Sequence, residues 1–221
     1  MLIRVIDFET TGLDESAGVV EIGWCDIAGE TIKGSGSAIC DPGFPIPPEA
    51  SAIHHITDEH VKGFRGASSM LADLAGADVY VAHNSRFDRQ FADPLNRSPW
   101  ICTLKAARRV WPDAPSHGNQ VLRYWLGINL PAKLAEPAHR AGPDAVVTAH
   151  LLLRLMDHAS VEEMIAWEAM PSILPKMPFG KHKGERFSEV PKDYLGWIVR
   201  QHDIDPDVKF TAEAALQEAA A

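Results

Sequence analysis

The sequence predicts an α/β fold, in which helices flank a mixed β-sheet. Residues 1–40 contain three apolar, β-branched segments that are typical of strands. Residues 78–169 then alternate between strand-like and helix-like patterns. Three prolines within residues 171–178 indicate a linker, and residues 179–221 form a small C-terminal segment. We therefore expect one main domain over residues 1–170, followed by this linker and a small appendage.

The N-terminal part is expected to supply three strands. Residues 3–8 form the first apolar run, and similar runs follow at about residues 19–28 and 31–40. The pair Gly29-Glu30 is a tight turn, so the second and third strands are expected to form a hairpin. The proline-rich stretch 41–48 is incompatible with a helix or a central strand, and we expect a loop there.

The middle of the chain is expected to alternate helices with buried strands. Thr57, followed by two acids, marks a helix start. Pro143 lies at or near the first turn of a long helix, where its missing N–H is tolerated. The expected helices cover residues 68–76, 87–95, 104–110, 118–126, 144–158 and 161–169, and the expected strands cover residues 78–84 and 100–103. The C-terminal segment ends in an alanine-rich tail.

Charge and composition narrow the function classes. A net charge of −9 argues against a passive nucleic-acid binder but not against an enzyme that holds phosphate through metal ions. Residues 86–109 depart from the acidic average with six basic and two acidic residues. Three scattered cysteines favour neither a zinc site nor a disulfide framework, and no apolar run is long enough to span a membrane. We therefore expect a cytoplasmic protein with reduced, buried cysteines.

Two carboxylates lie at the far end of the first predicted strand. Because side chains alternate along a strand, Asp7 and Glu9 share one face, roughly 6–7 Å apart. Two buried carboxylates that close repel each other, and burying unpaired charge is costly. A hard divalent cation such as Mg²⁺ would relieve this repulsion. The alternative is an edge strand with two solvated acids, and these residues alone do not separate the two interpretations.

Two more acids and a histidine are candidates for the same site. Asp88 follows the strand at residues 78–84, a common catalytic position in α/β sheets, although an acid at such a place is more often simply favoured by a helix N-terminus. Asp144 lies in the first turn of the long helix, and His139 precedes it by five residues on a loop. An imidazole has an ordinary pKa of about 6.5, which suits a general base, although a lone loop histidine is more often merely solvated.

Four motifs, in order along the chain, resemble those of the DEDDh 3′→5′ exonucleases. The motifs are Asp7-Phe8-Glu9-Thr10-Thr11-Gly12, Ile53-His54-x-Ile56-Thr57, Ala82-His83-Asn84-x-x-Phe87-Asp88 and His139-x-Ala141-x-x-Asp144. This family has a ribonuclease H-like fold, and the resemblance covers about residues 1–160. Residues 100–112 and the run from Phe179 to Trp197 are similar to one DNA-degrading bacterial branch of the family, which extends the likeness over nearly the whole chain.

The resemblance implies a two-metal mechanism. Asp7, Glu9, Asp88 and Asp144 would hold two Mg²⁺ or Mn²⁺ ions, with Asp7 bridging both. His139 would take a proton from the attacking water. The enzyme would release 5′-mononucleotides from the 3′ ends of single-stranded or duplex DNA, in repair or end trimming.

Further residues are candidates for holding the substrate. Thr10, Leu13 and Phe87 would contact the terminal nucleotide. His54 would contact sugar or phosphate, or would simply pack under the proline-rich loop. We also expect phosphate contacts upstream of the cleaved bond, although the lysine stretch can instead be a solvated turn. The residues expected to make them are Arg108, Arg109, Lys181 and Lys183.

Other functions compete with this interpretation. An RNA-trimming exonuclease or a polymerase proofreading subunit would use the same metal ligands. These ligands do not contact the 2′-OH of the sugar, so they do not distinguish DNA from RNA. A catalytically inactive nucleic-acid-binding domain belongs to a different class, but it would be expected to lack one of the four acids or His139. The sequence predicts neither the oligomeric state nor the role of the C-terminal segment.

Overall fold

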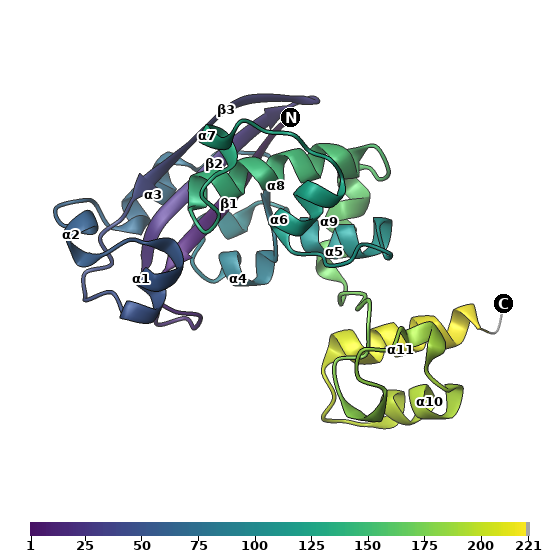
Figure 1. The fold of residues 1–221 in the computed structure, drawn as a ribbon. Coiled ribbons are helices and arrows are strands. Elements are labelled where there is room, and N and C mark those ends of the chain that lie inside the picture. Colours follow the sequence, from purple (N-terminus) through teal and green to yellow (C-terminus); the bar gives the residue numbers. More distant parts are fainter. Residues whose placement is uncertain (220–221) are drawn as a thin grey trace.

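The computed structural model describes residues 1–219 and contains a five-stranded sheet with the order β3-β2-β1-β4-β5 (Figure 1). The strands are β1 (Leu2–Thr10), β2 (Val19–Ala28), β3 (Thr31–Ile39), β4 (Val79–Ala82) and β5 (Trp100–Cys102). β1 pairs antiparallel with β2 and parallel with β4, and β4 pairs parallel with β5. The predicted mixed sheet is therefore confirmed.

Helices cover both faces of this sheet. The helices are α1 (Pro48–His54), α2 (Asp58–Val61), α3 (Ala67–Asp73), α4 (Ser85–Arg89), α5 (Thr103–Val110), α6 (Asn119–Trp125), α7 (Ala132–Ala135), α8 (Ala141–Met156), α9 (Val161–Ala169), α10 (Lys192–Arg200) and α11 (Pro206–Glu218). The long helix α8 crosses one face, where it packs with residues of α5, α6 and α9 (Figure 1). Residues of α3 and the segment after α4 cover the other face.

The two faces follow from the alternation of side chains along β1. Ile3 and Val5 are buried in the hydrophobic cluster beneath α8. Ile6 and Phe8 are buried in the cluster on the opposite face. Because residues two apart share a face, Asp7 and Glu9 continue the row of Ile3 and Val5 on the α8 side.

The C-terminal segment, residues 179–219 of the described chain, has a hydrophobic cluster of its own. Helices α10 and α11 pack together and lie to one side of the sheet, joined to it by an extended stretch (Figure 1). Leu195 and Ile198 of α10 and Val208 and Ala212 of α11 form this cluster, together with Phe187 and Val190 before α10 and Met177 of the linker. The alanine-rich tail is therefore part of a packed helix up to Glu218, since Val208 and Ala212 face that cluster.

Several element boundaries differ from those predicted. The helix expected at residues 87–95 is α4, which begins at Ser85 and ends at Arg89; Pro94 then precludes a regular helix, and a short 3₁₀ turn follows. The helix expected from residue 144 begins at Ala141, with Pro143 in its first turn. Helix α1 was not predicted and includes Pro48, because proline is accepted in a first helical turn. Helix α7 was likewise not predicted.

Within residues 1–219, no helix combines the length and the apolar character needed to cross a membrane. The three cysteines are buried and unpaired in this part of the chain, as expected.

Candidate active site

The site is built at the end of β1. Asp7 lies opposite Gly23 of β2, and Glu9 lies opposite Glu21. The pairing register shifts between Glu9 and Thr10, so the regular ladder ends just after the second carboxylate. Both acids thus project on the α8 face at the point where β1 leaves the sheet.

Gly23 allows α8 to approach the sheet at this point. A Cβ on Gly23 would lie 1.9 Å from the carbonyl oxygen of Ala141, which is the first residue of α8. Only a residue without a side chain fits here. The first turn of α8 therefore rests on β2 directly beside Asp7, and this turn carries Asp144.

A buried ion pair fixes the same turn of α8. Glu21 is only 1% exposed, and its carboxylate accepts hydrogen bonds from Arg140 Nε at 2.7 Å and from Arg140 Nη2 at 2.9 Å. The backbone N–H of Ala141 donates to the same carboxylate at 3.1 Å. Glu21 thus anchors the residue before α8 and the first residue within it, and bidentate geometry makes this anchor directional.

Asp144 is oriented by donors on both of its oxygens. Gln120 Nε2 donates to Oδ1 at 2.9 Å, and the backbone N–H of His139 donates to Oδ2 at 2.8 Å. His139 has a positive φ of 61°, which turns the chain sharply before α8. As a result, the loop that carries the candidate base is attached to one of the candidate metal ligands.

Three of the acids converge. Asp7, Glu9 and Asp144 each offer a carboxylate oxygen, and these atoms all lie within 4.8 Å of one another. Asp88 is 3% exposed in α4, and its charge raises the pKa of Asp7, so it lies close enough to act electrostatically on the group. The sequence prediction that these four acids gather at strand ends and helix starts is consistent with this arrangement.

The acids strongly perturb one another. Burial raises the pKa of Asp7 well above its usual value, and the carboxylates of Asp88, Asp144, Glu9 and Glu21 raise it further. Burial also raises the pKa of Glu9 to about 8, with contributions from Asp144 and Glu21 that Arg140 partly opposes. The pKa of Asp88 is raised by burial, although hydrogen bonds from the backbone of Asp88 and Phe8 oppose the shift.

This donor set fits a hard divalent cation. Every charge that raises the pKa of Asp7 is another carboxylate, so the protein itself leaves the negative charge at this position uncompensated. Clustered carboxylate oxygens are the ligands that Mg²⁺ and similar ions prefer. The residues that could hold such ions are Asp7, Glu9 and Asp144, with Asp88 beside them.

Asp88 is positioned by a polar network behind α4. Glu168 of α9 is largely buried and accepts hydrogen bonds from Ser85 Oγ at 2.9 Å and from Arg89 Nη1 at 3.2 Å. Lys105 Nζ lies 3.1 Å from the other oxygen of Glu168. Because Ser85 begins α4 and Arg89 ends it, Glu168 holds both ends of the helix that presents Asp88.

The candidate base and two of the predicted nucleotide contacts are at least partly exposed. The side chain of His139 is exposed on the loop before α8, open to solvent. Leu13 is 82% exposed, and its carbonyl accepts a hydrogen bond from Gln90 Nε2 at 3.3 Å, which ties the Leu13 loop to the residue that follows α4. Phe87 is half-buried in α4. An exposed leucine and a partly exposed aromatic ring thus lie on segments that are joined by a hydrogen bond.

The remaining predicted contacts near the site are buried. Thr10 Oγ1 donates to the carbonyl of Gly12 at 2.6 Å, so the hydroxyl shapes the turn after β1. His54 is 1% exposed, and its Nδ1 accepts a hydrogen bond from the backbone N–H of Ile56 at 3.0 Å. Burial lowers the pKa of His54, and the backbone of Thr10 opposes this shift. His54 is therefore buried next to Thr10, and its contact to sugar or phosphate stays a prediction.

The side chains of Arg108 and Arg109 form hydrogen bonds with the linker. Arg108 Nη1 donates to Ser172 Oγ at 2.7 Å, and Arg109 Nη2 donates to the carbonyl of Pro171 at 3.1 Å. Lys105 Nζ donates to the carbonyl of Met170 at 2.9 Å. These cations of α5 therefore fasten the start of the linker to the sheet domain, and their use as phosphate contacts stays a prediction.

Sequence reasoning did not identify Glu21, Arg140, Gly23, Gln120 or Glu168 as site residues. Of these residues, only Glu21 could have been recognised from the sequence. An acid between Val20 and Ile22 in a buried strand requires a partner of opposite charge. The partner, Arg140, is 119 residues away, and only the fold brings the two together.

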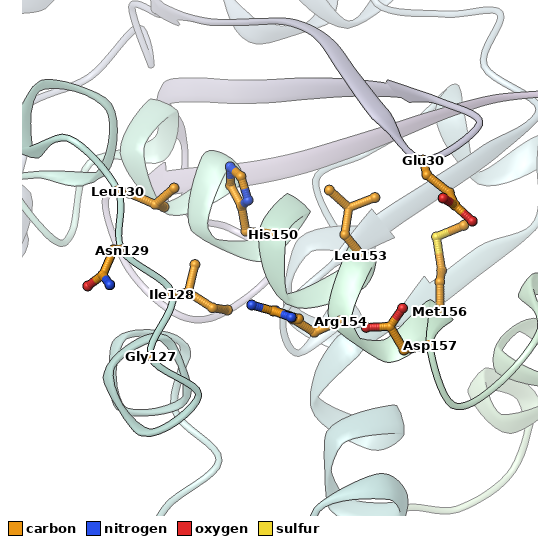
Figure 2. Close-up of a pocket in the computed structure, with 10 residues that line it drawn as sticks. All are labelled: Glu30, Gly127, Ile128, Asn129, Leu130, His150, Leu153, Arg154, Met156 and Asp157. Atoms are coloured by element: carbon orange, nitrogen blue, oxygen red, sulfur yellow. The ribbon is translucent and has the colours of Figure 1, made fainter.

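A separate cavity lies away from the acids. It has a volume of about 390 Å³ and lies between α8 and the loop after α6 (Figure 2). Its lining includes Ile128, Leu130, His150, Leu153 and Arg154, and it includes none of the predicted site residues. The acidic cluster is thus not part of this cavity.

Comparison with known proteins agrees with the site. A family model described as exonuclease matches residues 5–152, a range that includes all four acids and His139. A second model, described as a putative quorum-sensing-regulated virulence factor, matches residues 169–207.

Exodeoxyribonuclease 10 of Escherichia coli strain K12 is 33% identical over 98% of this chain and 99% of its own length. DNA polymerase III subunit epsilon of Aquifex aeolicus is 26% identical over 69% of this chain and 79% of its own length.

Solved structures show the same relationship. Exonuclease X in complex with 5′ overhanging duplex DNA matches with a TM-score of 0.69 and 35% identity, over 75% of this chain and 98% of that chain. E. coli exonuclease I in complex with a dA16 oligonucleotide matches with a TM-score of 0.61 and 15% identity, a likeness of fold. The predicted ribonuclease H-like fold and the resemblance to the exonuclease X branch are confirmed. With a family model over two thirds of its length and a relative aligned from end to end, the chain belongs to the exonuclease family.

Proposed function

We propose that this exonuclease removes nucleotides one at a time from the 3′ ends of DNA and releases 5′-mononucleotides. The observation that carries the proposal is the convergence of Asp7, Glu9 and Asp144 within 4.8 Å, beside Asp88, in a chain of this family. The name of the E. coli relative supports DNA as the substrate. Single-stranded DNA and duplex ends are both proposed substrates, and the exonuclease X complex with overhanging duplex DNA supports the second.

The four acids would hold two divalent ions, Mg²⁺ or Mn²⁺. Such ions stabilise the attacking and the leaving oxygen of an in-line phosphoryl displacement and lower the pKa of a bound water. Asp7 is the proposed shared ligand, since burial and four neighbouring carboxylates make it the group that most needs positive charge. Arg140 and Glu21 keep the first turn of α8 in place, so Asp144 stays within reach of Asp7 and Glu9.

The chain's own residues would position the strand and move the proton. His139, exposed on its loop and attached by its backbone to Asp144, would accept a proton from the attacking water. Leu13 and Phe87 would contact the terminal base from two segments that Gln90 joins. Thr10 would shape the turn beneath the terminal nucleotide and present its backbone there.

Upstream phosphates would pass along the cleft beside α5. A cavity of about 630 Å³ is lined there by Arg108, Lys176, Arg186 and His117. Arg108 reaches this cavity while it is bonded to Ser172, so it can serve the linker and a phosphate together. Charge reversal at Arg108 and Arg109 should raise KM and flatten the salt dependence of binding.

We also propose the division of the chain into an exonuclease domain of residues 1–170, a linker of residues 171–178 and a C-terminal segment. The separate hydrophobic cluster of α10 and α11 supports this division. We further propose a role in DNA repair or end trimming in the cytoplasm. A proofreading subunit is the second candidate, and the similarity to the Aquifex epsilon subunit favours it over an RNA-trimming enzyme.

The test is an end-labelled degradation assay. The purified chain, with Mg²⁺, receives a 5′-labelled strand as single-stranded DNA, duplex DNA or RNA, and the Asp7→Asn variant is the control. We expect DNA products that shorten from the 3′ end and that are absent with the variant. Preferential shortening of RNA would contradict the substrate assignment, and no shortening with Mg²⁺ or Mn²⁺ would contradict the proposed function.

A further inference from the structure

We propose that the C-terminal segment binds single-stranded DNA on a platform formed by Lys181, Tyr194 and Trp197, which we call the aromatic platform. This inference rests on the proposed function, because the ligand is the part of the substrate strand that lies 5′ of the cleaved nucleotide. The platform belongs to α10 and to a short 3₁₀ turn at Gly180–His182, which carry none of the acidic residues of the active site.

The two aromatic rings form a continuous surface. Tyr194 and Trp197 are three residues apart on α10 and therefore project from the same side of the helix. Their ring centroids are 5.4 Å apart with an interplanar angle of 30°. Lys181 Nζ lies over the Tyr194 ring, 5.1 Å from its centroid. An ammonium group and two neighbouring rings are thus presented together.

The hydrophobic packing of the C-terminal segment does not explain why residue 197 is a tryptophan. The cluster that holds α10 to α11 contains Leu195 and Ile198, while Trp197 contributes to neither its buried nor its partly buried members. Trp197 remains 43% exposed, so a large part of its indole ring faces solvent. An exposed tryptophan that the core does not use is free to contact a ligand.

The 3₁₀ turn that carries Lys181 packs closely against Tyr194. Gly180 has a positive φ of 72°, and a Cβ at this position would lie 2.5 Å from the Tyr194 hydroxyl oxygen. His182 packs edge-on against Tyr194 at a centroid distance of 4.7 Å, and its Nδ1 lies 2.9 Å from Glu185 Oε2. The arrangement therefore exists before any ligand binds, which reduces the entropy lost on binding.

The local charge favours a polyanion. Residues 176–186 contain four basic residues and one acidic residue, whereas the whole chain has a net charge of −9. Single-stranded DNA offers both complementary features, because its bases stack on aromatic rings and its phosphates pair with lysine. In a duplex the base faces are already stacked, so a single strand is the form that this surface fits.

Direct binding measurements test the proposal. The full chain with Asp7→Asn, which we expect to prevent cleavage, is titrated with 5′-labelled oligothymidylate of about 4 or about 20 nucleotides, and fluorescence anisotropy is recorded. We expect Trp197→Ala to weaken binding of the long strand by at least about fivefold and to leave the short strand unchanged. Lys181→Gln, at an exposed position, should act in the same direction without affecting folding.

Matched controls separate the possible failures. Trp125 is 44% exposed, almost the same as Trp197, and lies on α6 of the sheet domain, so Trp125→Ala should not change the affinity. Equal affinity of the parent, Trp197→Ala and Lys181→Gln for the long strand would overturn the proposal. A selective loss of RNA binding in the Trp197→Ala variant would overturn the assignment to DNA. If the chain with Asp7 intact does not shorten the short strand in the presence of Mg²⁺, that result would count against the active site and the proposed function, not against the platform.

Discussion

The ion pair between Glu21 and Arg140 allows a sharp test of how the active site is held together. The perturbation is Arg140→Ala. It removes two hydrogen bonds, at 2.7 and 2.9 Å, from a carboxylate that is only 1% exposed. The backbone N–H of Ala141 would then be the only remaining donor to Glu21 among the described residues. Glu9 lies opposite Glu21, so the freed charge would also face a second carboxylate.

The expected loss of stability is large for a single substitution. Breaking a buried pair by removing one partner costs about 3–5 kcal/mol. The side chain of Arg140 is 32% exposed, so water partly compensates the loss and we expect a value near the lower end, about 3 kcal/mol. In a chain of this size that corresponds to a decrease in Tm of about 6–12 °C. Activity should also decrease, since the first turn of α8 carries Asp144.

Thermal unfolding of the metal-free protein measures the effect. The control is Arg65→Ala, because Arg65 and Asp73 form an ion pair at 3.1 Å whose side chains are 59% and 62% exposed. Exposed pairs contribute at most about 1 kcal/mol, so this control should change Tm by no more than a few degrees. The double substitution Arg140→Met with Glu21→Gln should recover part of the stability. If Arg140→Ala destabilises no more than Arg65→Ala, the buried pair does not anchor α8 and our reasoning is wrong.

Three further predictions concern the acids, the base and the approach of α8. Burial and neighbouring carboxylates raise the pKa of Glu9 to about 8, so the stability linked to its protonated form is present at low pH and is lost as the pH rises through that value. The Tm of the metal-free protein should therefore decrease between the ordinary pKa of 4.5 and about pH 8 and should level off above it. Mg²⁺ or Glu9→Gln should reduce this decrease, and a Tm independent of pH in this range would contradict the shift. His139→Ala should lower kcat by about 10²–10⁴-fold while calorimetry shows unchanged Mg²⁺ binding, and a normal kcat would exclude His139 as the base. Gly23→Ala should lower both kcat and Tm, because its Cβ would lie 1.9 Å from the Ala141 carbonyl, whereas Gly34→Ala, which meets nothing within 4 Å, should be tolerated; equal effects would show that close packing at Gly23 is not required.

The sheet and the first carboxylate pair were predictable because they depend on local periodicity. Alternation along β1 places Asp7 and Glu9 on the face of Ile3 and Val5, and Phe8 on the other face, whatever the rest of the fold does. The positions of Asp88 and Asp144 were also expected, since both lie in first helical turns near strand ends.

What sequence did not predict depends on contacts between distant segments. The charge of Arg108 and Arg109 suggested nucleic acid, but the fold brings the linker within hydrogen-bonding distance of both. Likewise, no local pattern indicates that Glu21 pairs with Arg140. The short length of α4 and the helical tail also escaped prediction, because tertiary packing decides both.

The hydrogen bond from the His139 backbone to Asp144 Oδ2 has an evolutionary consequence. One carboxylate serves as a candidate metal ligand and also holds the loop that bears the candidate base. A substitution of Asp144 would therefore remove a metal ligand and the hydrogen bond to the His139 loop at once. Substitutions at this position should abolish activity and not adjust it gradually. Variation among relatives that tunes rate or substrate choice should instead accumulate at positions with a single task, such as Leu13 or Phe87.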